Sequence, residues 1–136
     1  MYLVDTNVVS EARRGNRHAI AWLRSIDPTT VCLSVITLGE IMRGIALKEK
    51  SDRASAARLS EWLLRLRHDH SSRILPVTDQ IAIECGRLAA LRPRGDADGL
   101  IAATAIVHQL ILVTRNVADF VDTPVAILNP WEAELD

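Results

Sequence analysis

Apolar residues recur along the chain in two alternating kinds of run. Short runs rich in Val, Ile and Leu predict strands, and longer stretches with apolar residues three or four apart predict helices. The predicted strands are 1–4, 30–34, 73–78, 111–116 and 125–128. The predicted helices are 7–14, 17–26, 35–48, 52–70, 80–91 and 96–110, with a short helical turn at 117–120. Strands separated by helices indicate an α/β sandwich of three layers, whose central sheet is mainly parallel and has four to five strands.

Local signals predict the ends of the last two long helices. Thr78 or Asp79 is placed to cap the helix 80–91, and Gly95 is expected to end that region. Asp96 is the expected N-cap of the helix 96–110, which is apolar almost all round and should therefore be buried. After the last strand, Trp131 is expected to dock on the body of the domain.

Composition narrows the class of protein without naming a function. We expect one domain, 1–136, because this length suffices for a single core. The N-terminus lacks the pattern of a secretory leader, and no apolar stretch is long enough to span a bilayer. Cys32 and Cys85 lie within apolar patterns, so we expect buried thiols and a cytoplasmic location. The net charge of −1 indicates no general electrostatic affinity for nucleic acid.

Four carboxylates are predicted to meet at one edge of the sheet. Asp5 ends the first strand, Glu40 lies in the second turn of a helix, Asp98 begins a helix, and Asp119 follows the fourth strand. Taken singly, each has a plainer alternative: an N-cap for Asp5 or Asp98, a solvated helix residue for Glu40 and a loop acid for Asp119. At the carboxyl edge of a parallel sheet they repel one another, and a divalent cation such as Mg²⁺ or Mn²⁺ relieves that repulsion.

The segments "MYLVDTN", "LSVITLGEIMRGI", "DGLIAATAIVHQLILVTRNVADF" and "LNPW" resemble the PIN-domain nucleases, and more narrowly the VapC and FitB-type toxins of bacterial toxin–antitoxin operons. The resemblance extends from residue 1 to about residue 131. It implies that Asp5, Glu40, Asp98 and Asp119 are the catalytic, metal-binding acids. Gly99 stands where the family commonly has Ala, which removes no ligand.

The resemblance implies an endoribonuclease that hydrolyses RNA phosphodiester bonds with Mg²⁺ or Mn²⁺. The four acids would hold the ion, which lowers the pKa of a bound water and neutralises developing charge. Five further residues are candidates for supporting the acids or contacting the substrate: Thr6, Thr114, Asn116, Arg43 and Arg115. An ordinary role in turns and caps is equally open for Thr6, Thr114 and Asn116.

The resemblance also implies a homodimer and a cognate VapB-like antitoxin that restrains the nuclease. The helix 52–70 carries Arg53, Arg58, Arg65 and Arg67 and is a candidate surface for that partner, although a solvated helix is the plainer interpretation. The alternative function is a non-catalytic PIN-like or receiver-like Mg²⁺-binding domain. A receiver requires a lysine after its last strand, and the only lysines are Lys48 and Lys50. A haloacid-dehalogenase-type phosphatase requires D-x-D where this chain reads "DTN".

Overall fold

A five-stranded parallel sheet forms the centre of the protein. The computed structural model describes residues 1–135. The strands are β1 (Tyr2–Val4), β2 (Val31–Ser34), β3 (Ile74–Leu75), β4 (Ile111–Val113) and β5 (Ile127–Leu128). They pair in the order β3-β2-β1-β4-β5, and every pair is parallel. The predicted α/β class and parallel sheet are therefore confirmed.

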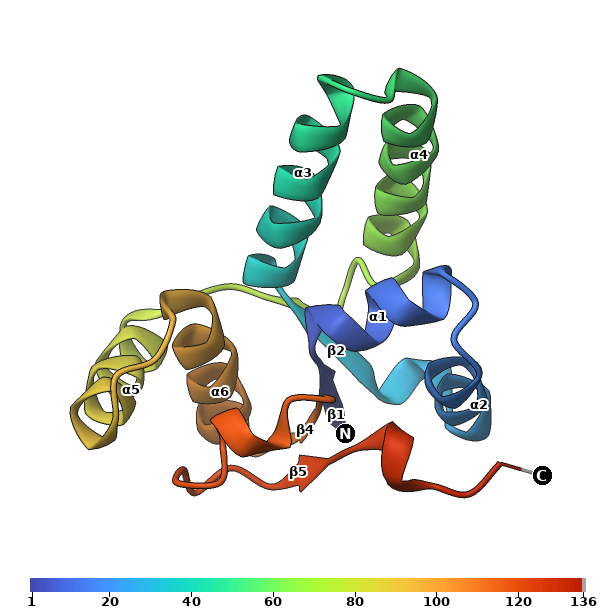
Figure 1. Ribbon diagram of the computed structural model, residues 1–136. Helices are drawn as coiled ribbons and strands as arrows, with labels where there is room; N and C mark the ends of the chain where they lie inside the picture. Colours follow the sequence, from blue (N-terminus) through green and yellow to red (C-terminus); the bar gives the residue numbers. More distant parts are fainter. Residues whose placement is uncertain (136) are drawn as a thin grey trace.

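Six α-helices surround the sheet (Figure 1). They are α1 (Thr6–Arg13), α2 (Arg17–Ser25), α3 (Val35–Glu49), α4 (Arg53–Asp69), α5 (Asp79–Leu91) and α6 (Asp96–His108). Three short 3₁₀ helices join them: η1 (Pro28–Thr30), η2 (Val117–Asp119) and η3 (Pro130–Glu132). Helix α6 is largely buried, as its apolar sequence predicts.

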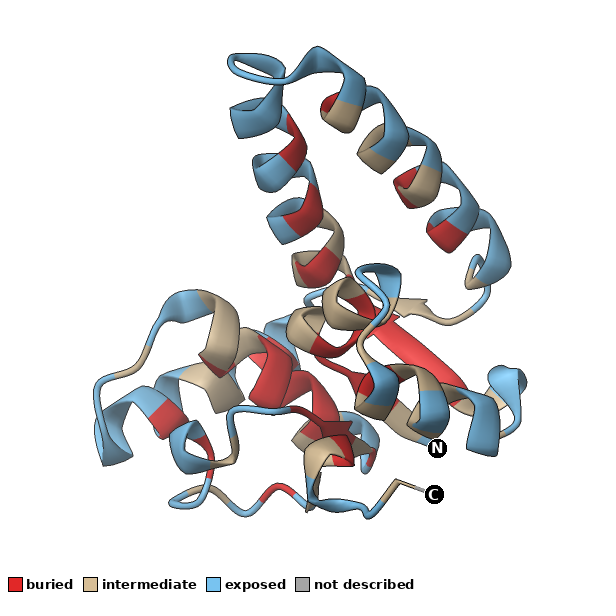
Figure 2. Ribbon diagram, turned by 45° about the vertical axis from the view of Figure 1, so that its right-hand side comes forward, coloured by how far each residue is buried: buried red, intermediate tan, exposed pale blue. Residues whose placement is uncertain are grey.

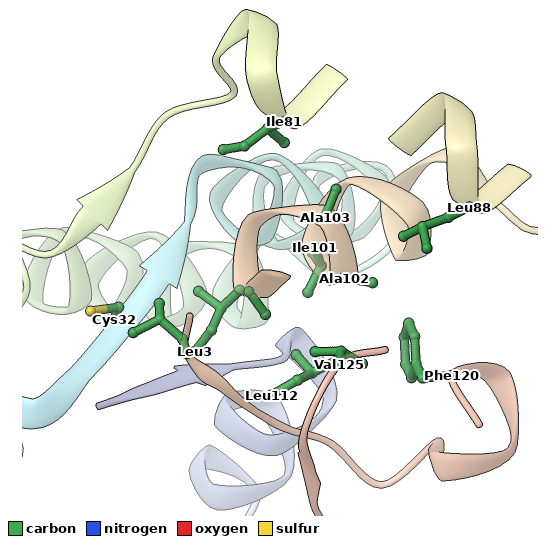
Figure 3. Close-up of a cluster of buried hydrophobic side chains, with 12 residues drawn as sticks. Leu3, Cys32, Ile81, Leu88, Ile101, Ala102, Ala103, Leu112, Phe120 and Val125 are labelled. Atoms are coloured by element: carbon green, nitrogen blue, oxygen red, sulfur yellow. The ribbon is translucent and has the colours of Figure 1, made fainter. Parts of the chain in front are cut away.

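Alternate residues of each strand enter two separate hydrophobic cores. Leu3 and Leu112 pack with α5, α6 and Phe120 on one face of the sheet (Figure 3). The next residues, Val4 and Val113, pack with α1, α2, α3 and α4 on the other face. Since successive strand side chains point to opposite faces, a short strand apolar at every position implies a sheet covered on both sides. This explains why the strand runs show no polar alternation.

Helices α3 and α4 form a hairpin that stands away from the sheet (Figures 1 and 2). Its buried residues face inward between the two helices, whereas its outer faces are exposed (Figure 2). Ile41 and Ile45 of α3 belong to the same core as Ala56 and Leu63 of α4. The base of α3 therefore lies at the carboxyl edge of the sheet, and its far end lies well outside it.

Several predicted boundaries differ from the structure. Thr78 is the N-cap of α5, but Gly95 is the N-cap of α6 and does not end α5, which stops at Leu91. The prediction that Asp96 caps α6 is wrong, because Asp96 is already the first helical residue. Strands β3 and β5 have two residues each, shorter than predicted, and Pro76 explains the first because it lacks the N–H that pairing needs.

The remaining predictions on the fold have mixed outcomes. Trp131 packs against the core below α1 and α2, as expected. Both cysteines are free thiols, but only Cys32 is buried, while Cys85 is half-buried. Among residues 1–135, no helix has the length and apolar character needed to cross a membrane. The predicted domain 1–136 ends on a residue outside the described part of the chain.

Candidate functional site

Asp5 lies between the end of β1 and the first turn of α1, where it is also the N-cap of that helix. Only 4% of the residue is exposed. Its Oδ1 accepts a hydrogen bond of 2.8 Å from the backbone N–H of Thr6. Its Oδ2 accepts bonds from the Thr114 hydroxyl, at 2.8 Å, and from Asn7 Nδ2, at 3.2 Å. The capping role and the predicted site role of Asp5 are therefore compatible, because each uses a different oxygen.

Burial raises the pKa of Asp5 from 3.8 to about 6. The hydrogen bonds from Thr114 and Thr6 oppose this shift by favouring the charged carboxylate, and the charges of Asp98 and Glu40 add to it. A charged carboxylate in this position is therefore costly unless a cation approaches it. An N-cap alone does not require such burial, since capping carboxylates are usually at the surface.

Thr6 links Asp5 to the second acid. Its hydroxyl donates a 2.7 Å hydrogen bond to Glu40 Oε1 and lies 2.9 Å from the hydroxyl of Thr37, which is fully buried. Glu40 is exposed, in the second turn of α3. A side chain added at Gly39 would meet nothing within 4 Å, so the approach to Glu40 from that side is open.

Asp98 lies in the first turn of α6, near enough to Asp5 for its charge to add to the raised pKa of Asp5. Burial raises the pKa of Asp98, and the charges of Asp119 and Glu40 raise it further. Asp98 thus interacts electrostatically with each of the other three acids, because the charges of Asp119 and Glu40 act on it and its own charge acts on Asp5. The helix approaches α5 closely here: a Cβ on Gly99 would lie 2.9 Å from Cys85 Sγ, which accounts for glycine where the family commonly has Ala.

Asp119 is held in place through its backbone. It is exposed at the end of η2, and its carbonyl oxygen accepts hydrogen bonds from Arg92 Nη2, at 2.7 Å, and from Arg94 Nη1, at 3.0 Å. Arg94 also pairs with Asp122 at 2.8 Å and donates to the carbonyl of Leu88 at 3.1 Å. The Arg94 side chain is only 5% exposed, so it joins the end of α5 firmly to the loop that carries Asp119.

The supporting residues predicted from the sequence differ in burial and in their contacts with the acids. Thr114 is fully buried and bonds Asp5, and Asn116 donates its backbone N–H to the Thr114 hydroxyl at 3.1 Å. Arg115 is exposed, and its guanidinium lies 4.9 Å from the centre of the Trp131 ring. Arg43 is exposed on α3. No contact within residues 1–135 ties Arg43 to the four acids, so its role stays a prediction.

Three residues that position the acids were not predicted. Asn7 donates to Asp5 and accepts the backbone N–H of Arg115 at 3.2 Å, and Thr37 contacts Thr6. Both lie inside the motifs "DTN" and "TLGE", so their proximity to the acids was available as a signal. Arg94 carries no such signal, because Asp119 and Asp122, the partners through which it positions the loop, lie 25 and 28 residues further along the chain.

The donor set suits a hard divalent cation. Its four members are carboxylates, and the raised pKa values of Asp5 and Asp98 show charges that a cation stabilises. Within residues 1–135, no three acidic, histidine or cysteine side chains have the mutual spacing of a metal site as they stand. Mg²⁺ usually retains several waters and takes one or two carboxylates directly, so it does not require a closed cage. The ligand set itself stays a prediction.

The chain is similar to known proteins over nearly its whole length. The model of the PIN domain family matches residues 2–125. Toxin FitB of Neisseria gonorrhoeae is 36% identical over 96% of this chain and 99% of its own length. VapC ribonuclease Y4jK of Sinorhizobium fredii is 32% identical over 97% of this chain and 99% of its own. The structure of FitAB bound to IR36 DNA fragment superposes with a TM-score of 0.89, at 33% identity over 99% of both chains. The chain therefore belongs to the PIN-domain family, and VapC- and FitB-type proteins are among its full-length relatives.

Proposed function

We propose that this protein is a metal-dependent endoribonuclease and the toxin of a VapBC-type toxin–antitoxin pair. The observation that carries the proposal is the electrostatic coupling of Asp5, Glu40, Asp98 and Asp119 at the carboxyl edge of the sheet. Full-length similarity to a VapC ribonuclease and to toxin FitB supports RNA as the substrate. A non-catalytic scaffold has no use for acids placed so that their charges add to the raised pKa values of Asp5 and Asp98.

The residues around the acids keep them in place without neutralising them. Thr114, Asn7 and the N–H of Thr6 orient both oxygens of Asp5, and the hydroxyl of Thr6 orients Glu40. These donors are neutral, so the site retains its negative charge. Arg115, steadied by Trp131, lies beside the site and is suited to contact a phosphate of the RNA.

A divalent ion at these carboxylates would supply an activated water and neutralise charge on the phosphate that is attacked. Asp5, Glu40, Asp98 and Asp119 are the residues that would hold it, and Mg²⁺ or Mn²⁺ suits their oxygen ligands. The protein's own contribution is to hold these acids in defined orientations through neutral hydrogen-bond donors. Hydrolysis would break a P–O bond of the RNA backbone and add water across it.

The direct test is to incubate the purified protein with labelled RNA in Mg²⁺, in Mn²⁺ and in EDTA. We expect internal cleavage with either metal and none in EDTA. The variant Asp98→Asn should be inactive, whereas the matched variant Asp96→Asn should cleave normally. Asp96 lies in the same turn of α6 but contributes to the pKa of neither Asp5 nor Asp98. Cleavage that persists in EDTA, or equal loss in both variants, would contradict the proposal and favour the alternative, a Mg²⁺-binding or partner-binding domain.

We further propose a cognate antitoxin partner, because a free nuclease endangers the RNA of its own cell. A cavity of about 370 Å³ beside α4 offers it an apolar groove, lined by Val9, Ala12, Leu23, Trp62 and Leu66 among others. An arginine or lysine of the partner that pairs with the acids would compete with the metal for the same charge. We also propose that the toxin is a homodimer, which sedimentation of the pure protein tests.

The proposed inhibition has a clear signature. The complex should not cleave RNA, and excess Mn²⁺ should restore part of the activity, because metal and partner side chain compete for one site. Inhibition that is independent of the metal concentration would rule out a competing side chain while leaving the nuclease activity itself in place.

A further inference from the structure

A second cavity, of about 370 Å³, is strongly basic and lies outside the cluster of acids. It is formed by the last turn of α1, the far end of α3 and the first half of α4. Its polar lining consists of four cationic and two hydroxyl side chains: Arg13, Arg14, Lys48, Arg58, Ser10 and Ser55. We call it the basic pocket. Its charge contrasts with the net charge of −1 of the whole chain.

In the described part of the chain, most of the cationic side chains that line the basic pocket form no ion pair. Among residues 1–135, Arg13, Lys48 and Arg58 form no ion pair, and Arg14 pairs with Glu11 at 3.1 Å. Hydrogen bonds from the hydroxyl and the N–H of Ser55 lower the pKa of Asp52, and the charges of Arg58 and Lys48 lower it further, so Asp52 offsets part of the positive charge. Three neighbouring cations that form no ion pair repel one another, so an anion that enters the basic pocket is stabilised.

Two of the cations are held in defined positions. The Arg13 guanidinium lies 5.7 Å from the centre of the Trp62 ring, and Arg58 Nη2 donates a 3.0 Å hydrogen bond to the Ser55 hydroxyl. These contacts reduce the loss of side-chain freedom when a ligand binds. A guanidinium held in this way retains further N–H groups for the oxygens of a phosphate.

Helices α1 and α3 each extend from the region of the acids to the basic pocket. On α1, Arg13 lies seven residues beyond Thr6, and on α3, Lys48 lies eight residues beyond Glu40. At 1.5 Å per residue these separations are about 10 and 12 Å along the helix axes. A stacked nucleic-acid strand advances about 3.4 Å per nucleotide, so these separations along the helix axes correspond to about three nucleotides.

We propose that the basic pocket binds a backbone phosphate of the RNA, about three nucleotides from the bond that is cleaved. This inference rests on the proposed function, which supplies the RNA. An RNA strand carries a phosphate at every nucleotide, so any strand that passes the acids presents one within reach of the pocket. An acidic protein segment needs a particular sequence to do the same. The acids repel RNA, and the pocket offsets that repulsion at a distance from the reaction.

The test compares two double variants that remove the same charge. Lys48→Gln with Arg58→Gln removes two cations of the basic pocket. Lys50→Gln with Arg65→Gln removes two exposed cations of the same hairpin that do not line it. Binding of a fluorescent 12-nucleotide RNA is measured by anisotropy in EDTA, which suppresses cleavage, at several salt concentrations. A 12-residue glutamate peptide serves as the protein-like probe, and thermal melting verifies that both variants fold.

We expect the pocket variant to bind the RNA roughly fivefold to tenfold more weakly, with a shallower salt dependence, and the matched variant to bind like the wild type. Equal losses in both variants, or no loss in either, would overturn the proposal. So would a loss of peptide binding with RNA binding intact, which would assign the basic pocket to a protein partner.

Cleavage separates this inference from the proposed function. If the wild type cleaves RNA in Mg²⁺ and the pocket variant has an unchanged KM, the pocket proposal fails alone. If the pocket variant loses RNA binding while the wild type cleaves nothing in Mg²⁺ or Mn²⁺, the proposed function fails alone. On RNA too short to reach the pocket, both variants should have the wild-type kcat/KM.

Discussion

The two ends of the acidic cluster are built in opposite ways. Asp5 is 4% exposed, and neutral donors bond its side chain directly. Asp119 is exposed with no hydrogen bond to its carboxylate among residues 1–135, and its position depends on Arg92 and Arg94 bonding its carbonyl oxygen. One acid is thus positioned by its own side chain, and the other by the loop that carries it.

The difference shows how a site can hold arginines near carboxylates without neutralising them. Arg94 is only 5% exposed and lies close enough to lower the pKa of Asp98 slightly, but its hydrogen bonds go to Asp122 and to backbone carbonyls. Its charge therefore stabilises the loop and leaves Asp119 available. If Arg94 paired with Asp119 itself, it would compete with a cation for that carboxylate.

The largest effect is expected from Asp5→Asn. The variant keeps the shape of the side chain and removes its charge, so RNA cleavage should fall at least about a thousandfold, which corresponds to about 4 kcal/mol of transition-state stabilisation. Steady-state cleavage assays measure the loss, and circular dichroism verifies the fold. Wild-type cleavage by this variant would remove Asp5 from the chemistry.

The pH dependence of stability is the next largest effect. The folded protein binds the proton on Asp5 more tightly than the unfolded chain does, so protonation of Asp5 stabilises the fold. This contribution to the free energy of unfolding is fully present below about pH 4 and is lost as the pH rises through about 6. The pKa difference corresponds to about 3 kcal/mol. Urea unfolding in EDTA at pH 4 and pH 7.5 measures it for the wild type and for Asp5→Asn. The decrease in the free energy of unfolding from pH 4 to pH 7.5 should be about 3 kcal/mol smaller in the variant than in the wild type. Equal decreases would show that ionisation of Asp5 does not destabilise the fold.

The backbone contacts at the other end are tested by Arg94→Met. Loss of the bonds to Asp119 and Asp122 should lower kcat about tenfold to a hundredfold at a temperature where the variant is folded, since it frees the loop that carries an acid. Arg87→Met is the matched control, because Arg87 pairs with Glu84 at the surface, 3.2 Å away. A variant with reduced stability but full kcat would show that Arg94 supports the fold alone.

The smallest effect is expected from Thr114→Val, which removes one donor to Asp5 and the acceptor of the Asn116 N–H. We expect kcat to fall about tenfold and stability to fall by about 1–2 kcal/mol. Thr123→Val is a suitable control, since its hydroxyl bonds only local backbone. If both variants have the same activity, the donor is not needed to orient Asp5.

The same contrast explains what could be predicted from the sequence. Asp5 follows an apolar strand and opens a helix, so periodicity and strand-end position both indicate it, and its partners Thr6 and Asn7 are its neighbours in sequence. Asp119 is indicated by little more than its motif. The arginines that position it, Arg92 and Arg94, lie in the segment between α5 and α6, and only the folded chain brings them next to Asp119.

Surface features were harder to predict because they also depend on contacts between segments that are distant in the sequence. The arginines of α4 appear in the sequence as one group along a helix, but Arg58 lines the basic pocket and Arg65 does not. The division depends on where the last turn of α1 meets α4, which no local pattern encodes. The strands, in contrast, were located because burial on both faces leaves a short continuous apolar run.

The most direct test of the central claim is a thermal melt of three proteins with and without Mn²⁺: the wild type, Asp98→Asn and Asp96→Asn. If the carboxylates repel one another and share a cation, Asp98→Asn should melt above the wild type in EDTA, and Mn²⁺ should raise the Tm of the wild type and of Asp96→Asn but not that of Asp98→Asn. If Asp98→Asn melts below the wild type in EDTA and Mn²⁺ raises all three Tm values equally, Asp98 is a structural residue and the acids do not form one metal site.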